Sequence, residues 1–144
     1  MVLDFIKEVC DLLEIDIPEI SYESSHFLTE TMLAICEPAL NIIYLRKPEK
    51  TTPDFLFVIA HELRHIYQYQ TDEYFYLSSY VPSNECSSIE EYNLQIAEVD
   101  ANAFAAVVMI AMFSIQPQWN NLTDRVIAAI NDRKKIIIQE LEWD

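Results

Sequence analysis

The sequence contains no glycine among its 144 residues. Glycine-rich phosphate-binding loops need positive φ angles and a close approach of the backbone to the ligand, so nucleotide sites of the GxGxxG and GxxxxGK[ST] kinds are excluded. Basic residues are also scarce, because 9 Lys and Arg stand against 24 Asp and Glu, for a formal net charge of −15. Since nucleic-acid backbones and anionic membranes are bound by clustered basic side chains, we expect neither as a partner.

Cysteines and long apolar runs are few as well. Cys10, Cys36 and Cys86 are widely spaced and contain no CxxC pair, which argues against a disulfide framework and against a thiolate zinc site. The longest apolar run, residues 103–113, is too short for a membrane span of about 20 residues and is expected to be a buried core helix. The N-terminus lacks the basic and apolar regions of a secretory signal, so we expect a cytoplasmic protein.

The length and the apolar content of the chain predict one folded domain over residues 1–144. Apolar residues make up 51% of the chain, and a chain of this length buries a core without help from disulfides or metals. The spacing of apolar residues and the breaks at proline predict an α+β fold, rich in helix, with a small antiparallel sheet. The expected elements are helices over 2–13, 53–69, 88–112 and 121–141, a short strand at 20–22, a hairpin of strands 32–36 and 41–45, and an irregular loop over 71–88.

The clearest chemical signal is the pentapeptide His61-Glu62-Leu63-Arg64-His65, which lies within the helix expected after Pro53. Residues i and i+4 share one face of a helix, so both imidazoles can point at a single metal ion. Glu62 is offset by one residue, which places its carboxylate beside the ion as a base rather than as a ligand. Metal-assisted hydrolysis requires this division of roles.

A catalytic zinc ion takes three protein ligands and keeps one position open. Glu98, which lies 33 positions after His65, is the best candidate for the third ligand, and Asp100 is a weaker rival because it points away from the Glu98 face of the helix. Asn102 lies one turn after Glu98, where its side chain can hydrogen-bond the free ring nitrogen of a ligating histidine. The predicted zinc ligands are therefore His61, His65 and Glu98.

Together, HELRH at 61–65 and EVDANAFA at 98–105 resemble the gluzincin metallopeptidases, and among these the small ImmA/IrrE-like domains. The resemblance covers roughly residues 53–112. It implies a zincin-like fold, in which an active-site helix lies under a small sheet whose edge strand holds an extended peptide. It also implies Zn²⁺ bound by His61, His65 and Glu98, with Glu62 as the general base of peptide-bond hydrolysis.

Three further assignments stay open. The donor that stabilises the oxyanion is His26, Tyr92 or a tyrosine of the 74–80 segment. Cys36 is either a small buried residue or a thiolate that inhibits the zinc. We expect an extended substrate to add to the sheet along the 41–45 strand.

Three functions compete at this stage. The first is zinc-dependent hydrolysis of a protein or peptide substrate. The second is a catalytically inactive, zinc-stabilised binding module that holds a protein partner with its acidic face and its tyrosine-rich loop. The third and weakest is an acidic mimic of nucleic acid. Neither the substrate nor the oligomeric state follows from the sequence.

Overall fold

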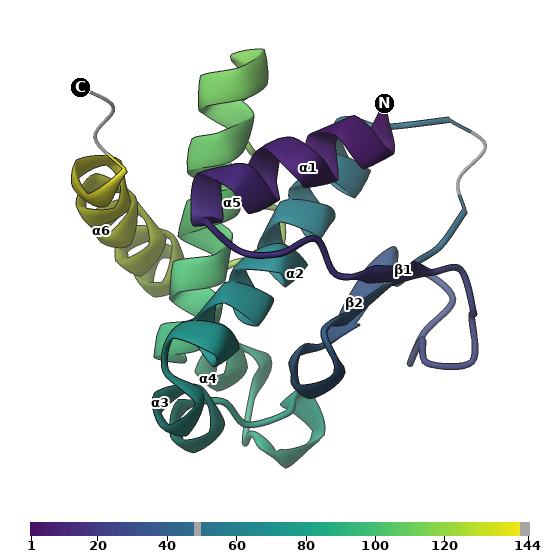
Figure 1. Cartoon of the computed structure of the whole chain (residues 1–144). Coiled ribbons are helices and arrows are strands. Elements are labelled where there is room, and N and C mark those ends of the chain that lie inside the picture. The colour runs from purple at the N-terminus through teal and green to yellow at the C-terminus, as the bar shows by residue number, and fades with distance from the viewer. Residues whose placement is uncertain (48–49, 142–144) are drawn as a thin grey trace.

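A computed structural model describes residues 1–47 and 50–141 of the chain. Its helices and one small sheet make the fold α+β, as the sequence predicts (Figure 1). The elements, in chain order, are α1 (Val2–Leu13), β1 (Glu19–Ser21), β2 (Ala34–Glu37), the 3₁₀ turn η1 (Pro38–Leu40), β3 (Ile42–Leu45), α2 (Pro53–Thr71), α3 (Glu73–Ser79), the 3₁₀ turn η2 (Ser83–Glu85), α4 (Ile89–Asn93), α5 (Ile96–Phe113) and α6 (Asp124–Glu140).

The sheet is mixed rather than antiparallel, so this part of the prediction is wrong. Its strand order is β1-β3-β2. The expected hairpin is present, because β2 and β3 pair antiparallel around η1. β1 lies parallel to β3 on the other side. The long connection from β1 to β2 lets the chain return in either direction, which the hairpin pattern could not reveal. β3 is therefore the central strand and β2 an edge strand, so the expected place for an added peptide along residues 41–45 is wrong.

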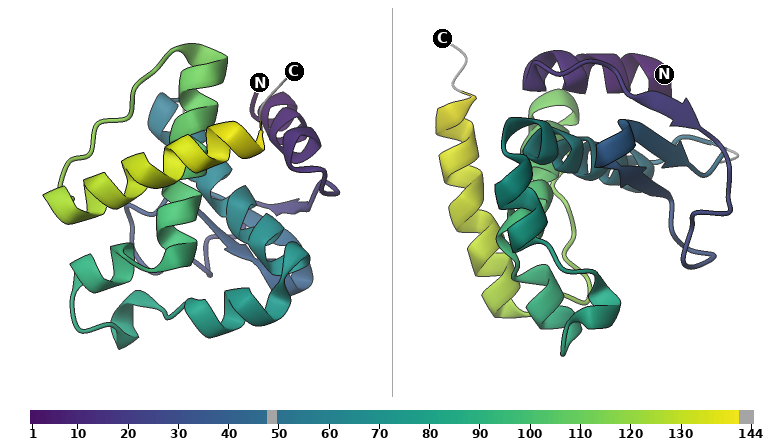
Figure 2. Two further views of the ribbon diagram at one scale, coloured as in Figure 1. Left: turned by 90° about the vertical axis from the view of Figure 1, so that its left-hand side faces the viewer. Right: turned by 60° about the horizontal axis from the view of Figure 1, so that its bottom comes forward.

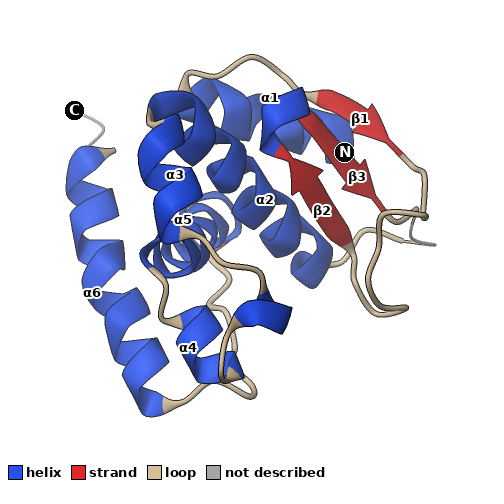
Figure 3. Ribbon diagram, turned by 90° about the horizontal axis from the view of Figure 1, so that it is seen from below, coloured by secondary structure: helices blue, strands red, loops and turns tan. Residues whose placement is uncertain are grey.

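Helix α2 starts with a strong N-terminal signal. The Thr52 side chain accepts a hydrogen bond from the Phe55 amide at 3.2 Å, and Pro53 occupies the first helical turn, where its missing N–H costs nothing. The apolar face of the helix packs into the core, against β2 on one side and α5 on another. Figure 3 shows β2 and α3 on opposite sides of α2. The buried residues of α2 include Phe55, Ile59, Leu63 and Ile66.

Helix α5 is the most deeply buried helix of the fold. It lies between α2 and α6 (Figure 2), which explains why it is apolar around most of its circumference. Among the described residues it is the one helix long and apolar enough to cross a membrane by length and composition, and 61% of that window is buried inside the fold. Burial of this kind is what a core helix shows.

The sequence predicts one helix over 88–112, but the structure has two, α4 and α5, interrupted at residues 94–95. The start is as expected, since the Ser88 side chain accepts a hydrogen bond from the Glu91 amide at 3.0 Å. At the break, the Gln95 side chain bonds both backbone groups of Val81, 14 residues earlier in the chain. This tertiary contact ends the helix early and anchors the preceding segment.

The segment 71–88 is more ordered than the irregular loop that we expect from its composition. It contains α3 and the turn η2. The Asp72 side chain accepts a hydrogen bond from the Phe75 amide at 3.0 Å and so caps α3. The Thr123 hydroxyl accepts a hydrogen bond from the Val126 amide at 3.4 Å and caps α6, so the last helix begins at Asp124 and not at residue 121.

Candidate metal centre

Three side chains from two neighbouring helices meet at one point. His61 and His65 lie one turn apart on α2, and Glu98 lies in the first turn of α5. The two histidine Nε2 atoms are 3.1 Å apart. The Glu98 oxygens lie 3.4 Å from Nε2 of His61 and 2.6 Å from Nε2 of His65. One ligand atom from each residue lies within 4.8 Å of the others, so these residues could hold a metal ion. We call His61, His65 and Glu98 the metal group.

Hydrogen bonds on the far side of each imidazole orient the two rings. Nδ1 of His61 lies 2.8 Å from Oδ1 of Asn102, the contact expected from the sequence. Nδ1 of His65 lies 2.8 Å from Oε1 of Gln68. An amide oxygen accepts a hydrogen bond, so each Nδ1 carries a hydrogen and Nε2 is the atom that each ring turns toward Glu98, where a metal ion would bind.

Gln68 belongs to the candidate site, and the sequence reasoning missed it. Its amide group donates to the Ala97 carbonyl at 2.9 Å and to the Asp100 carboxylate at 2.8 Å. Both of these partners are acceptors, so the amide nitrogen must face them and the amide oxygen must face His65. A polar residue three positions after His65 on the same helix was the available signal, because i and i+3 are neighbours.

The donor set fits a cation. The Nε2 atoms of both histidines face the Glu98 carboxylate, so a proton or a metal ion is required between them. Glu98 is only 3% exposed, and its Oε2 lies 2.6 Å from Nε2 of His65. A buried charge in this position is costly unless a positive charge offsets it. Imidazole and carboxylate ligands are those that zinc and similar divalent ions bind.

The pKa values of His65 and Glu98 also indicate that a positive charge is favoured at this site. Burial opposes the charged form of His65, but the adjacent Glu98 carboxylate raises the pKa of His65 to about 9. Burial also opposes the charged form of Glu98, and the two histidines nevertheless hold the pKa of Glu98 well below its ordinary value. The site therefore favours one positive charge beside the carboxylate, supplied by a proton or by a metal ion.

Glu62 lies beside the three-residue group and not within it. Its Oε2 is 3.9 Å from Nε2 of His61. Its Oε1 accepts a hydrogen bond from the backbone N–H of Cys36 on β2 at 3.2 Å. Burial raises the pKa of Glu62, partly offset by the two histidines. The edge strand thus holds one carboxylate oxygen and leaves the other on the side of the metal group.

Asp100, the rival third ligand, does not belong to the group. Its carboxylate is held by Arg64 at 2.7 Å and by Arg133 of α6 at 2.8 Å, and it accepts the Gln68 amide. This largely buried network joins α2, α5 and α6, and Gln68 connects it to His65. Asp100 therefore binds arginine side chains of α2 and α6, and it is not available as a metal ligand.

The remaining candidates lie at different distances from the group. Tyr92 lines the same cleft as His61, Glu62 and Glu98. The Tyr76 and Tyr80 rings each lie 5.8 Å from the His65 ring, so the tyrosine-rich segment borders the site.

His26, in contrast, lies on the sheet. It stacks on Tyr44 with ring centroids 4.0 Å apart, and its Nδ1 is 3.1 Å from Glu37. Its recorded contacts are therefore with the sheet and not with the metal group. Cys36 is one of the free cysteines, and burial raises the pKa of its thiol, which favours the neutral form over a metal-binding thiolate.

Comparison with known proteins adds no assignment. No family model matches the chain, and neither a curated protein nor a solved structure is significantly similar to it. The function must be argued from the geometry of the site.

Proposed function

We propose that this protein is a zinc-dependent hydrolase of peptide bonds in a protein or peptide substrate. The observation that carries the proposal is the meeting of His61, His65 and Glu98 with the Glu62 carboxylate beside them. Two imidazoles and one carboxylate are a ligand set of catalytic zinc sites, which keep one position open for water or substrate. A structural zinc site uses four protein ligands.

Each residue then has a defined task. When bound, zinc polarises the scissile carbonyl and lowers the pKa of its water to about 7. Glu62 takes the proton of the attacking water and passes it to the leaving amine. The Cys36 amide keeps the Glu62 carboxylate in position, and burial makes this carboxylate a better base by raising its pKa.

The free edge of β2 supports an extended peptide as the substrate. The Arg46 amide donates to the Leu33 carbonyl, and pairing alternates along an antiparallel ladder. Ala34 and Cys36 therefore direct their backbone groups away from β3, toward the open edge. Cys36 uses its N–H on Glu62 in this direction, so a peptide added along β2 would pair with the backbone groups of Ala34 and run past the metal group. An active-site helix beside a sheet edge is also what a zincin-like fold would provide.

Metal analysis and one substitution test the proposal. Protein purified without a histidine tag should contain about one zinc ion, and His65→Ala should contain almost none. Glu62→Gln should keep the zinc and lose hydrolysis of denatured-protein or peptide-library substrates. A Glu62→Gln variant as active as the wild type, or His65→Ala protein with full zinc content, would refute the proposed mechanism.

One observation favours a second candidate, a zinc-stabilised binding module. The outer face of α3 exposes several large apolar side chains next to the tyrosines that border the site, namely Tyr74, Phe75 and Leu77. Exposed apolar surface of this kind often marks a site of protein contact. In that case zinc would still bind and raise the melting temperature, but no peptide from a diverse library would be cleaved.

A further inference from the structure

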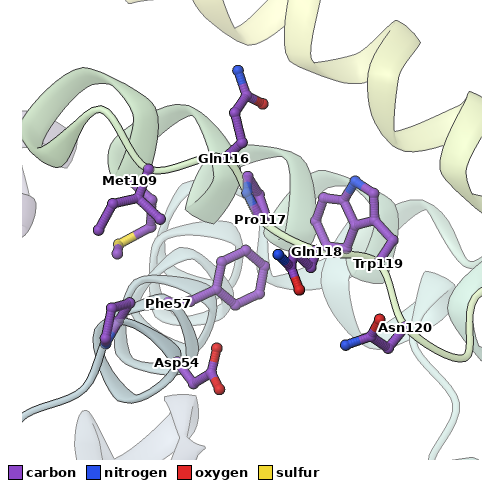
Figure 4. Close-up of a pocket in the computed structure, with 10 residues that line it drawn as sticks. Asp54, Phe57, Met109, Gln116, Pro117, Gln118, Trp119 and Asn120 are labelled. Carbon is purple, nitrogen blue, oxygen red and sulfur yellow. The ribbon is translucent and has the colours of Figure 1, made fainter.

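A second pocket opens beside the metal cleft (Figure 4). It measures about 290 Å³ and lies between the start of α2 and the segment that connects α5 to α6. The Phe57 ring forms one wall, and Pro117 and Trp119 lie across from it. The metal-site chemistry described above makes no use of this pocket.

The pocket and the metal cleft share a wall. Phe57, Gln118, Trp119 and Asn120 line both of them. Along α2, Asp54, Phe57 and His61 are spaced i, i+3 and i+7, so they follow one face of the helix. Seven residues at 1.5 Å each put Asp54 about 10 Å along the axis from His61.

The lining suits a planar cation. The Phe57 and Trp119 rings meet edge to face with centroids 5.7 Å apart, and aromatic faces attract guanidinium groups. Asp54 is the only charged side chain among the residues that line this pocket. Gln118 and Asn120 add side-chain amide oxygens, which accept hydrogen bonds from the five N–H groups of an arginine.

The charged residues that line the pocket and the metal cleft also favour a cationic ligand. Their charged lining residues are Asp54, Glu62 and Glu98, with no Lys or Arg among them. A divalent ion at the metal group would offset Glu62 and Glu98 and leave Asp54 without a counter-charge. The chain as a whole carries a formal charge of −15, which favours the approach of cationic ligands.

From this we infer that the pocket binds an arginine side chain of the substrate. The inference rests on the proposed function, because it places that arginine within about three residues of the scissile bond, given about 3.3 Å per residue of an extended peptide. Asp54 pairs with the guanidinium group, which packs against the aromatic pair of Phe57 and Trp119. The protein is then selective for basic segments of its substrates.

Binding is tested first without any hydrolysis. The indole N–H signal of Trp119 is followed by NMR while N-acetyl-arginine amide is added to the protein as purified, and Trp119→Phe identifies this signal between the two tryptophans of the chain. We expect a saturable shift with arginine and none with the norleucine or glutamate analogue. Asp54→Asn should weaken arginine binding about threefold to tenfold, the range for a partly exposed ion pair with an aromatic contact.

Asp124→Asn is the matched control. Asp124 also lies in the first turn of a helix and the change removes the same charge, but Asp124 does not line the pocket. Arginine binding should therefore be unchanged in this variant. Equal shifts for arginine and norleucine, or equal effects of the two substitutions, would overturn the inference.

A peptide assay separates this inference from the proposed function. Peptides that differ only in arginine, norleucine or glutamate near the cleavage point should be hydrolysed fastest with arginine, and Asp54→Asn should reduce kcat/KM for that peptide alone. Hydrolysis with no arginine preference overturns the pocket assignment and leaves the enzyme. Arginine binding at Trp119 without hydrolysis of any peptide supports the pocket and overturns the enzyme.

Discussion

At the scale of single residues, the site depends on two side-chain amides. Each amide oxygen keeps a hydrogen on Nδ1 of one histidine and so turns Nε2 of that ring toward Glu98. Asn102 accepts from His61 and Gln68 accepts from His65. If these amides are lost, each ring can rotate or move its hydrogen to Nε2, where it would block a metal. Partners of this kind are worth about 10–100-fold in metal affinity.

We therefore expect Asn102→Leu to lower zinc affinity by about 10–100-fold. The leucine is similar in size but cannot accept the hydrogen bond from Nδ1 of His61. Asn102→Asp keeps an acceptor in the same position and should bind zinc at least as tightly as the wild type. Competition with a chromophoric chelator measures both variants. Equal affinities for the leucine and aspartate variants would contradict the orienting role.

The spacing of His61, His65 and Glu98 predicted that these side chains meet, and the structure brings them together. His61 and His65 share a helical face, and α5 packs on α2. The parts that could not be predicted depend on contacts between distant segments. Gln68 acts only because Ala97 and Asp100 orient its amide, and β2 rather than β3 is the edge strand because β1 pairs with β3.

At the scale of helices and strands, a buried ion network fixes the helices behind the metal group. Arg64 is 3% exposed and Asp100 is 6% exposed, and Arg133 brings α6 into the same network. A buried ion pair adds little compared with apolar packing, but removal of one partner leaves the other charge buried and alone. Asp100 of α5 therefore holds both α2, through Arg64, and α6, through Arg133.

Asp100→Asn should lower the free energy of unfolding at neutral pH by about 3 kcal/mol. Burial opposes the charge of Asp100, but the hydrogen bonds from Arg64 and its other partners keep the pKa of Asp100 below the ordinary value of 3.8. The stabilisation is therefore complete above that ordinary value and is lost as the pH falls through the lower folded pKa. Urea unfolding between pH 7 and pH 3 should show the difference between variant and wild type shrink at the acidic end.

The exposed residue Asp132 of α6 supplies the control. Asp132→Asn makes the same chemical change on a neighbouring element, and it should alter the free energy of unfolding by less than about 0.5 kcal/mol. An equal effect of the two substitutions would mean that the network does not stabilise the fold.

The ends of helices were harder to predict from the sequence than the helices themselves. The apolar period is compatible with one helix from 88 to 112, and only the tertiary bonds from Gln95 to Val81 explain the break. Where the signal is local, as in the cap of α2 by Thr52, the sequence predicts the boundary correctly. The difference lies in whether the deciding contact is near or far along the chain.

At the scale of the whole molecule, the proposed metal ties together the two helices that carry the core. α2 and α5 make the most extensive helix contact of the fold, and the ligands come from both of them. A ligand that binds only the folded state raises its stability by mass action. Metal content and thermal stability should consequently change together.

We expect added zinc to stabilise the metal-free protein by about 2.7 kcal/mol when its concentration is a hundredfold above Kd. His65→Ala should abolish this gain, because only two ligands remain. His26→Ala is the matched control, since His26 lies on the sheet beside Glu37 and Tyr44, and its melting temperature should rise with zinc as in the wild type. Calorimetry with and without zinc measures all three proteins. If His65→Ala gained as much stability as His26→Ala, the ion would be bound elsewhere, and the convergence of α2 and α5 would have no role in holding it.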